Sequence, residues 1–151
     1  MKIIIGCDNA AVELKNQVIE LLKSEGHEVI NIGVDSVDDT TYYPEVASKL
    51  CKEIQSMNFT ARGILICGTG LGMTMTANKF KGIRAALCND TYSAERAMLS
   101  NNSNVLCFGS RVLGPELAKK IVSEWISLEF KDGRSTAKVQ EMIEIDNENF
   151  K

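Results

Sequence analysis

The sequence predicts an α/β protein in which helices cover both faces of a five-stranded parallel sheet. Three observations predict this class. Short apolar runs alternate with longer segments whose apolar residues recur at helical spacing. The apolar runs are continuous rather than alternating, as expected of strands buried on both faces. The chain has 151 residues, a usual length for one domain, so residues 1–151 are expected to form a single domain.

Three strands and two helices are predicted in the first half of the chain. Residues 2–6 form a run rich in β-branched side chains, typical of a strand. Residues 11–25 have apolar side chains at helical spacing, and the glycine that follows supplies a helix stop. Residues 28–32 are a second apolar run, followed by a polar loop rich in Asp and Thr. A proline opens the helix expected over residues 44–56, and residues 63–67 form the third strand.

The second half alternates in the same way after a glycine-rich loop. The expected order is helix 72–79, strand 83–88, helix 92–99, strand 104–108, helix 115–128 and helix 137–145. Pro115 suits the first turn of its helix, which has Trp125 on its apolar side. Gly133 breaks the chain before the last helix.

Composition excludes several classes of function. The chain has 20 acidic and 17 basic residues, which argues against a nucleic-acid binder with a broad basic surface. No stretch approaches the roughly 18 apolar residues of a membrane span, and the N-terminus lacks the apolar run of a signal peptide. We therefore expect a cytoplasmic protein. The five cysteines are widely spaced and the chain has one histidine, so no metal site is expected.

The most informative segment is the glycine-rich loop after the third strand. In parallel α/β folds the functional site lies at the carboxyl ends of the strands. Cys67 ends the strand there, and Gly68, Gly70 and Gly72 follow. Such a loop lets backbone amides converge on an anion, and Cys67 at its mouth is a candidate base or nucleophile. This pairing suggests enolisation next to a carbonyl; the alternative is a tight turn with an inert thiol.

Polar residues at the ends of other strands extend this candidate site. Asp8 and Asn9 follow the first strand and either bind sugar hydroxyls or cap the next helix. Arg111 follows the fifth strand, while Arg134 and Lys138 come after the last long helix. These cations are candidates for binding one phosphate from one or two subunits, or they are solvated surface charges.

Several motifs in order resemble one enzyme family. They are Gly6-Cys7-Asp8, residues 64–70, 77–79 and 82–86, Asn104-Val105-Leu106 and Gly109-Ser110-Arg111-Val112. The chain resembles the B-type ribose-5-phosphate isomerases, a family that also contains the galactose-6-phosphate isomerase subunits. The resemblance implies a three-layer α/β/α Rossmann-like fold, no metal or organic cofactor, and aldose–ketose isomerisation of a sugar phosphate through a cis-enediolate.

The resemblance also assigns roles to residues of this chain. It makes Cys67 the base that removes the C–H proton, with Thr69 beside the reacting carbons. Asp8, Tyr43 and Asn101 match substrate-binding positions, as do Gly68, Gly70, Leu71 and Gly72 of the anion-binding loop, and Asn9 stands at another such position with a different residue type. Arg111 and Arg134 match phosphate-side positions, and Lys138 keeps a positive charge at a third.

The resemblance further implies a homodimer or tetramer whose active sites lie between subunits. Residues from about 131 to 151 would form a C-terminal arm whose helix packs on a neighbouring subunit and brings Arg134 and Lys138 towards its site. The alternative is an ordinary terminal helix that packs on its own core.

Three positions depart from the family pattern. Family members usually have a histidine where Asn9 stands, another where Ser100 stands, and an arginine where Lys138 stands. The histidine at the position of Ser100 is credited with opening the sugar ring. We therefore expect a substrate that is already acyclic or opens readily, such as a tetrose phosphate, or a different pentose or hexose phosphate. Ser100, as a candidate catalytic residue, or a water could instead relay the ring-opening proton more slowly. The alternative is a non-catalytic sugar-phosphate-binding subunit of a hetero-oligomer or a regulator.

Overall fold

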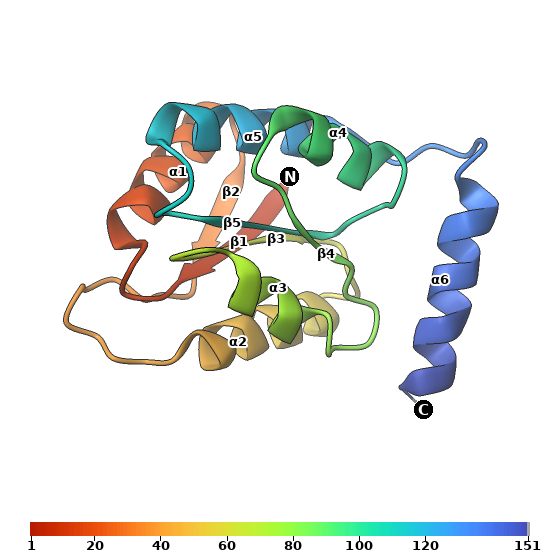
Figure 1. Cartoon of the computed structure of the whole chain (residues 1–151), viewed down its shortest axis with the longest axis horizontal. Helices are drawn as coiled ribbons and strands as arrows, with labels where there is room; N and C mark the ends of the chain where they lie inside the picture. The colour runs from red at the N-terminus through yellow and green to blue at the C-terminus, as the bar shows by residue number, and fades with distance from the viewer. Residues whose placement is uncertain (151) are drawn as a thin grey trace.

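A computed structural model describes residues 1–150, in which strands and helices alternate as predicted (Figure 1). The strands are β1 (Lys2–Cys7), β2 (Glu28–Asn31), β3 (Arg62–Cys67), β4 (Ala85–Leu87) and β5 (Val105–Gly109). The helices are α1 (Val12–Ser24), α2 (Tyr43–Ser56), α3 (Leu71–Ala77), α4 (Thr91–Leu99), α5 (Pro115–Ser127) and α6 (Thr136–Asn149). No helix in this range is long and apolar enough to cross a membrane.

The five strands form one parallel sheet in the order β2-β1-β3-β5-β4. Helices α1, α4 and α5 lie on one face, and α2 and α3 lie on the other (Figure 1). The predicted three-layer α/β/α class is confirmed. The chain runs from β1 outward to β2 and then returns to β3 on the other side of β1, so the strand order reverses between β1 and β3. Ligand crevices form at such a switch point, at the carboxyl ends of the strands.

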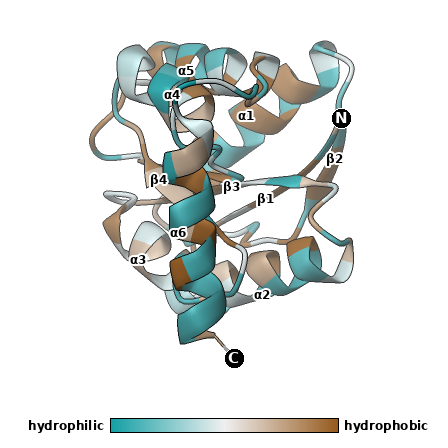
Figure 2. Ribbon diagram, turned by 90° about the vertical axis from the view of Figure 1, so that its right-hand side faces the viewer, coloured by the Kyte–Doolittle hydropathy of each residue, from teal (hydrophilic) through white to brown (hydrophobic). Residues whose placement is uncertain are grey.

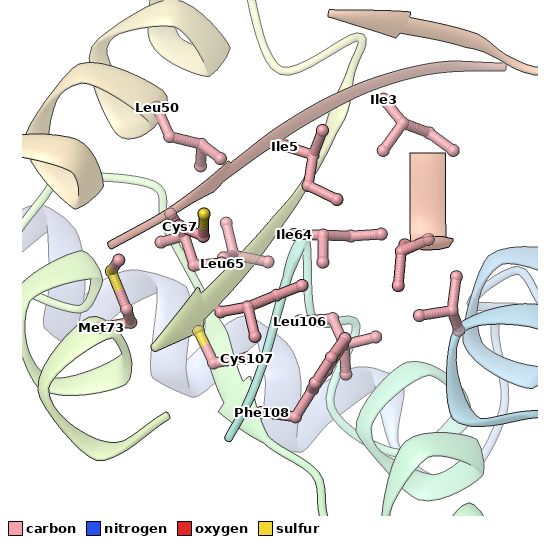
Figure 3. Packing of buried hydrophobic residues seen from close by; sticks show 14 of the residues in the cluster. Ile3, Ile5, Cys7, Leu50, Ile64, Leu65, Met73, Leu106, Cys107 and Phe108 are labelled. Carbon is pink, nitrogen blue, oxygen red and sulfur yellow. The ribbon is translucent and has the colours of Figure 1, made fainter. Parts of the chain in front are cut away.

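The core forms because the central strands are apolar on both faces. Ile3, Ile4 and Ile5 are completely buried, as are the side chains of β3 and β5 that pack beside them (Figure 3). The register pairs Cys67 of β3 with Gly109 of β5. The two loops that leave these strands therefore start side by side, which positions the glycine-rich loop.

Strand β4 is shorter than the sequence predicts, because asparagine side chains replace ladder hydrogen bonds at its start. Asn104 Oδ1 accepts from the backbone N–H of Arg84, and Asn104 Nδ2 donates to the carbonyl of Gly82. Asn78 makes a similar pair of bonds with the backbone of Ala85. The carbonyl of Arg84 still accepts from the backbone N–H of Asn104 at 3.0 Å, but its N–H is taken by a side chain, and the strand begins only at Ala85.

Helix α6 stands apart from the layers, beyond the β4 edge of the sheet (Figure 1). It is longer than the expected 137–145, and it contacts the body where Asp146 Oδ2 accepts from the N–H of Gly82 at 2.8 Å. Hydrophobic residues remain on its surface (Figure 2), among them Met142 and Ile145, which are 37% and 54% exposed. Its packing on a neighbouring subunit stays a prediction.

Candidate active site

The glycine-rich loop between β3 and α3 encloses the thiol of Cys67. The side chain is 5% exposed, and its Sγ accepts a hydrogen bond from the backbone N–H of Gly70 at 3.1 Å. Gly70 has φ +81°, and a Cβ there would lie 2.7 Å from the carbonyl carbon of Phe108. Only glycine fits this conformation and this close approach. The loop therefore wraps over the strand end and brings a backbone donor to the sulfur.

The loop after β5 supports the glycine-rich loop from beside it. The N–H of Ser110 donates to the carbonyl of Cys67 at 2.8 Å, and the N–H of Arg111 donates to that of Gly68 at 3.0 Å. The Arg111 guanidinium lies over Gly68, where an added Cβ would be 3.2 Å from its Nη1. Thr69 is exposed at the tip, and its Oγ1 accepts from the N–H of Leu71 at 3.2 Å. The Arg111 guanidinium and the N–H of Gly70 thus both lie at the loop that covers the thiol.

Tyr43 reaches the same loop from the first turn of α2. A Cβ at Gly72 would overlap the Tyr43 ring, so the absence of a side chain at Gly72 makes room for it. The preceding loop is anchored by Lys15, which is fully buried and donates to Asp35 Oδ1 at 2.6 Å and Asn31 Oδ1 at 3.0 Å. Asn31 Nδ2 also donates to Asp35 Oδ1, at 2.8 Å, and the hydrogen bonds that Lys15 and Asn31 donate lower the pKa of the Asp35 carboxyl.

Asp8 and Asn9 lie beside the loop but differ in their contacts. The N–H of Asp8 donates to the carbonyl of Ile66 at 3.3 Å, which ties the end of β1 to β3. Asp8 Oδ1 accepts from the N–H of Ala10 at 3.0 Å, so the carboxylate supports its own turn and keeps a second oxygen for a ligand. Asn9 is exposed. The structure therefore places both residues at the predicted edge.

The remaining four thiols differ from Cys67 in their surroundings. Burial raises the pKa of Cys7 to about 11 and those of Cys51, Cys88 and Cys107 to about 12. These four groups stay protonated near neutral pH, as expected of packing residues. Within residues 1–150, Cys67 has the one sulfur that accepts a backbone N–H, whereas the thiols of Cys7 and Cys51 donate to carbonyl oxygens.

The other predicted ligands lie elsewhere, in a cavity of about 720 Å³ between α4 and α6. Its lining consists of Tyr92, Arg96, Ser100, Asn101, Arg134, Ser135, Lys138, Val139 and Met142. Arg96 also lines the cavity but is not among the residues that the sequence predicts; its Nε and Nη2 donate to Ser100 Oγ at 2.9 and 2.7 Å. The available signal was its position four residues before Ser100 on one helix, which places both on the same face.

The two groups of residues lie at opposite edges of the sheet. Cys67 and Arg111 follow the carboxyl ends of β3 and β5, whereas Ser100 and Asn101 precede the amino end of β5. One chain therefore does not bring Arg111 together with Arg134 and Lys138 around a single phosphate. A site that uses both groups takes them from two chains. Across residues 1–150, no three His, Cys, Asp or Glu side chains come together in a way that could hold a metal ion.

Comparison with known proteins gives one consistent result. The family model described as "Ribose/Galactose Isomerase" matches residues 3–142. The chain is 46% identical to "D-erythrulose-4-phosphate isomerase" of Pectobacterium atrosepticum over 142 residues, covering 94% of this chain and 93% of the relative. It is also 46% identical to "Ribose-5-P isomerase B" of Listeria innocua over 149 residues, 99% of each chain. The structure of ribose-5-phosphate isomerase B from Clostridium thermocellum superposes with a TM-score of 0.92, at 40% identity and 99% coverage of each chain.

Proposed function

Because the chain belongs to the ribose/galactose isomerase family, we propose that it interconverts the aldose and ketose forms of a sugar phosphate through a cis-enediolate, with Cys67 as the base. The observation that carries this proposal is the thiol of Cys67 at the mouth of the glycine-rich loop, 3.1 Å from the N–H of Gly70. A base and converging backbone donors are the two parts that enolisation needs.

The proposed reaction moves one proton between neighbouring carbons. The Cys67 thiolate removes the proton from the carbon next to the carbonyl, and the electron pair passes to the carbonyl oxygen. Backbone amides of residues 68–72 stabilise the negative oxygen of the enediolate. The thiol then returns the proton to the former carbonyl carbon, while the proton of the neighbouring hydroxyl shifts to the other oxygen. Thr69, Asp8 and Tyr43 surround this loop and are the proposed contacts for the sugar hydroxyls.

The proposed substrate is an open-chain sugar phosphate. Asn9 and Ser100 stand where a ring-opening enzyme of this family usually has histidines, and the one histidine of the chain, His27, lies before β2. A four-carbon aldose whose O4 is phosphorylated has no free hydroxyl that can close a five-membered ring, so it needs no ring opening. The relatives include enzymes named for erythrulose 4-phosphate and for ribose 5-phosphate.

We also propose that the working site is shared between two copies of the chain in a homodimer or tetramer. The separation of Cys67 and Arg111 from the cavity of Arg134 and Lys138 supports this, because one chain holds these groups at opposite edges. In such a site one chain supplies the base and the loop amides, and the other supplies the phosphate-side cations.

The test is a coupled assay with four-, five- and six-carbon aldose phosphates, using the wild type and Cys67→Ala. Cys51→Ala is the matched control, since it removes a buried thiol from α2. We expect turnover in the wild type and the control and a loss of at least about 1,000-fold in kcat without the base. The outcome that contradicts the proposal is that the protein binds sugar phosphates but turns none of them over, both alone and with a second subunit type added. The protein is then a binding subunit, and the isomerase proposal is wrong.

A further inference from the structure

Helix α4 presents a polar stripe to the cavity that it shares with α6. Tyr92, Arg96 and Ser100 follow each other at four-residue intervals and all line the cavity. The Nε and Nη2 atoms of Arg96 both donate to Ser100 Oγ, at 2.9 and 2.7 Å. A planar guanidinium holds its donors in a fixed geometry, so this double contact fixes the serine hydroxyl in one place.

This contact determines what the Ser100 hydroxyl can do. A hydroxyl oxygen has two acceptor lone pairs and one proton. Both lone pairs face Arg96 donors, so the oxygen is not free to accept a proton from a ligand. Within residues 1–150 the hydroxyl donates to no protein acceptor, which leaves its proton for a ligand in the cavity. Arginine does not lose its own proton in proteins. The pair is therefore a fixed group of donors.

The charge of the cavity matches a phosphate. Arg96 approaches from α4, and Arg134 and Lys138 approach from the α6 side. The lining includes no carboxylate, and none of the three cations forms an ion pair within the described part of the chain. Arg134 and Lys138 can bind the phosphate dianion, while Arg96 has N–H groups left beyond the two that bind Ser100. These remain for the hydroxyl oxygens of the sugar.

We propose that Arg96 is a specificity-determining residue that positions Ser100 as a fixed donor and thereby favours four-carbon, open-chain sugar phosphates over ring-closed ones. This inference rests on the proposed function. Ring opening needs a group that accepts one proton and gives another, and the part of the site that lines this cavity has neither a histidine nor a carboxylate to do so. A four-carbon sugar 4-phosphate needs only donors for its oxygens, and the Arg96–Ser100 pair supplies them.

The experiment compares kcat and KM of the full-length protein for D-erythrose 4-phosphate and D-ribose 5-phosphate. The variants are Arg96→Leu, Arg96→Lys, Ser100→Ala and the double variant Arg96→Leu/Ser100→Ala. Lys120→Leu is the control, because it removes an exposed cation from α5. Loss of charge-assisted hydrogen bonds is worth about 10- to 100-fold. We expect Arg96→Leu to lower kcat/KM for the four-carbon substrate by that factor and for the five-carbon substrate by less than about threefold.

The remaining variants test whether Arg96 acts through Ser100. Lysine keeps the charge without the paired donors, so Arg96→Lys is expected to recover part of the loss. Arg96→Leu is expected to have a much smaller effect in the Ser100→Ala background, as coupled residues do in a double-mutant cycle. Equal losses for both substrates, or effects that simply multiply, would overturn the proposal. If Arg96→Leu does not fold, Arg96→Lys carries the same comparison.

A binding measurement separates this inference from the proposed function. D-erythritol 4-phosphate has four carbons and no carbonyl, so calorimetry reports its binding without turnover. If the wild type turns over no sugar phosphate, the proposed function fails and calorimetry decides the inference. The inference about Arg96 is then supported if Arg96→Leu binds D-erythritol 4-phosphate at least tenfold more weakly than the wild type and Lys120→Leu do. The inference fails if the wild type and both variants bind this ligand with the same affinity.

Discussion

Replacing Gly70 by alanine tests whether the glycine-rich loop is built around a close backbone approach. Gly70 precedes α3 with φ +81°, and its N–H donates to Cys67 Sγ. An added Cβ would lie 2.7 Å from the carbonyl carbon of Phe108 and 2.7 Å from Leu87 Cδ1. Backbone atoms of a buried strand cannot move aside as a flexible side chain does, so the loop itself has to shift.

The size of the effect follows from two separable causes. A left-handed conformation destabilises a residue with a Cβ by about 1–2 kcal/mol, and overpacking of a tight site adds about 1–3 kcal/mol. We expect Gly70→Ala to lower the free energy of unfolding by about 3 kcal/mol. For a domain of this length that lowers Tm by about 6–12 °C. Gly26→Ala isolates the first cause, because Gly26 has φ +87° and nothing within 4 Å of its Cβ position.

The assay is thermal unfolding followed by circular dichroism, with isomerase kinetics on the same samples. Gly26→Ala is expected to lower the free energy of unfolding by about 1 kcal/mol and leave kcat unchanged, since it lies after α1 and far from the loop in the chain. Gly70→Ala is expected to lose about 100-fold or more in kcat, because misplacement by about 1 Å has that effect. The reasoning is refuted if the two variants lose equal stability, or if Gly70→Ala keeps its kcat.

Three further predictions follow from buried groups and from α6. Lys15→Met removes the hydrogen bonds that anchor the loop before Tyr43, so we expect it to lower the free energy of unfolding, measured by urea titration, by about 2–4 kcal/mol. The control is Lys23→Met, which replaces an exposed lysine of the same helix and should change this free energy by less than about 0.5 kcal/mol. The four buried thiols have pKa values raised from 9.0 to about 11–12, so their contribution to the free energy of unfolding is fully present below pH 9 and is lost as pH rises through the folded values. The free energy of unfolding from urea titrations should fall between pH 9 and 11 by up to about 1.4 kcal/mol per thiol per pH unit, and a constant value from pH 8 to 11 would contradict this. Asp146→Ala removes the bond to Gly82 and is expected to speed amide hydrogen exchange in α6 while β3 keeps its protection; unchanged exchange in α6 would show that this bond does not hold the helix.

Most of the fold could be predicted because the pattern of apolar residues along the sequence indicates which segments are buried. Continuous apolar runs give parallel strands covered on both faces, and proline or glycine marks the starts of α2, α3 and α5 and the end of α1. The start of β4 could not be predicted in this way. Ile83 and Arg84 lead directly into the apolar residues of β4, but the N–H of Arg84 donates to Asn104 Oδ1, a side chain 20 residues further along the chain. Only the folded structure brings that side chain to the strand.

The site could be predicted in part for the same reason. Cys67 and the glycines after it form one local segment, so their spacing shows their arrangement. Arg96 lies on a helix face whose pattern is that of a solvated surface, and its role depends on Ser100 and on α6 across the cavity. The sequence also contained the information that the predicted site residues lie at two edges of the sheet, because Ser100 precedes strand β5 and Cys67 ends strand β3. Strand direction alone places them at opposite edges.

In the proposed reaction, the division of the site separates proton transfer from phosphate binding. The carboxyl edge has the thiol and a backbone amide donor beside it, whereas the cavity has three cations and neither a histidine nor a carboxylate in its lining. Binding energy gained at the phosphate can then be used to hold the reacting carbons against Cys67. This arrangement predicts that Lys138→Ala lowers kcat as well as raising KM, although it leaves the base untouched. A rise in KM alone would mean that phosphate binding is uniform and does not assist the chemical step.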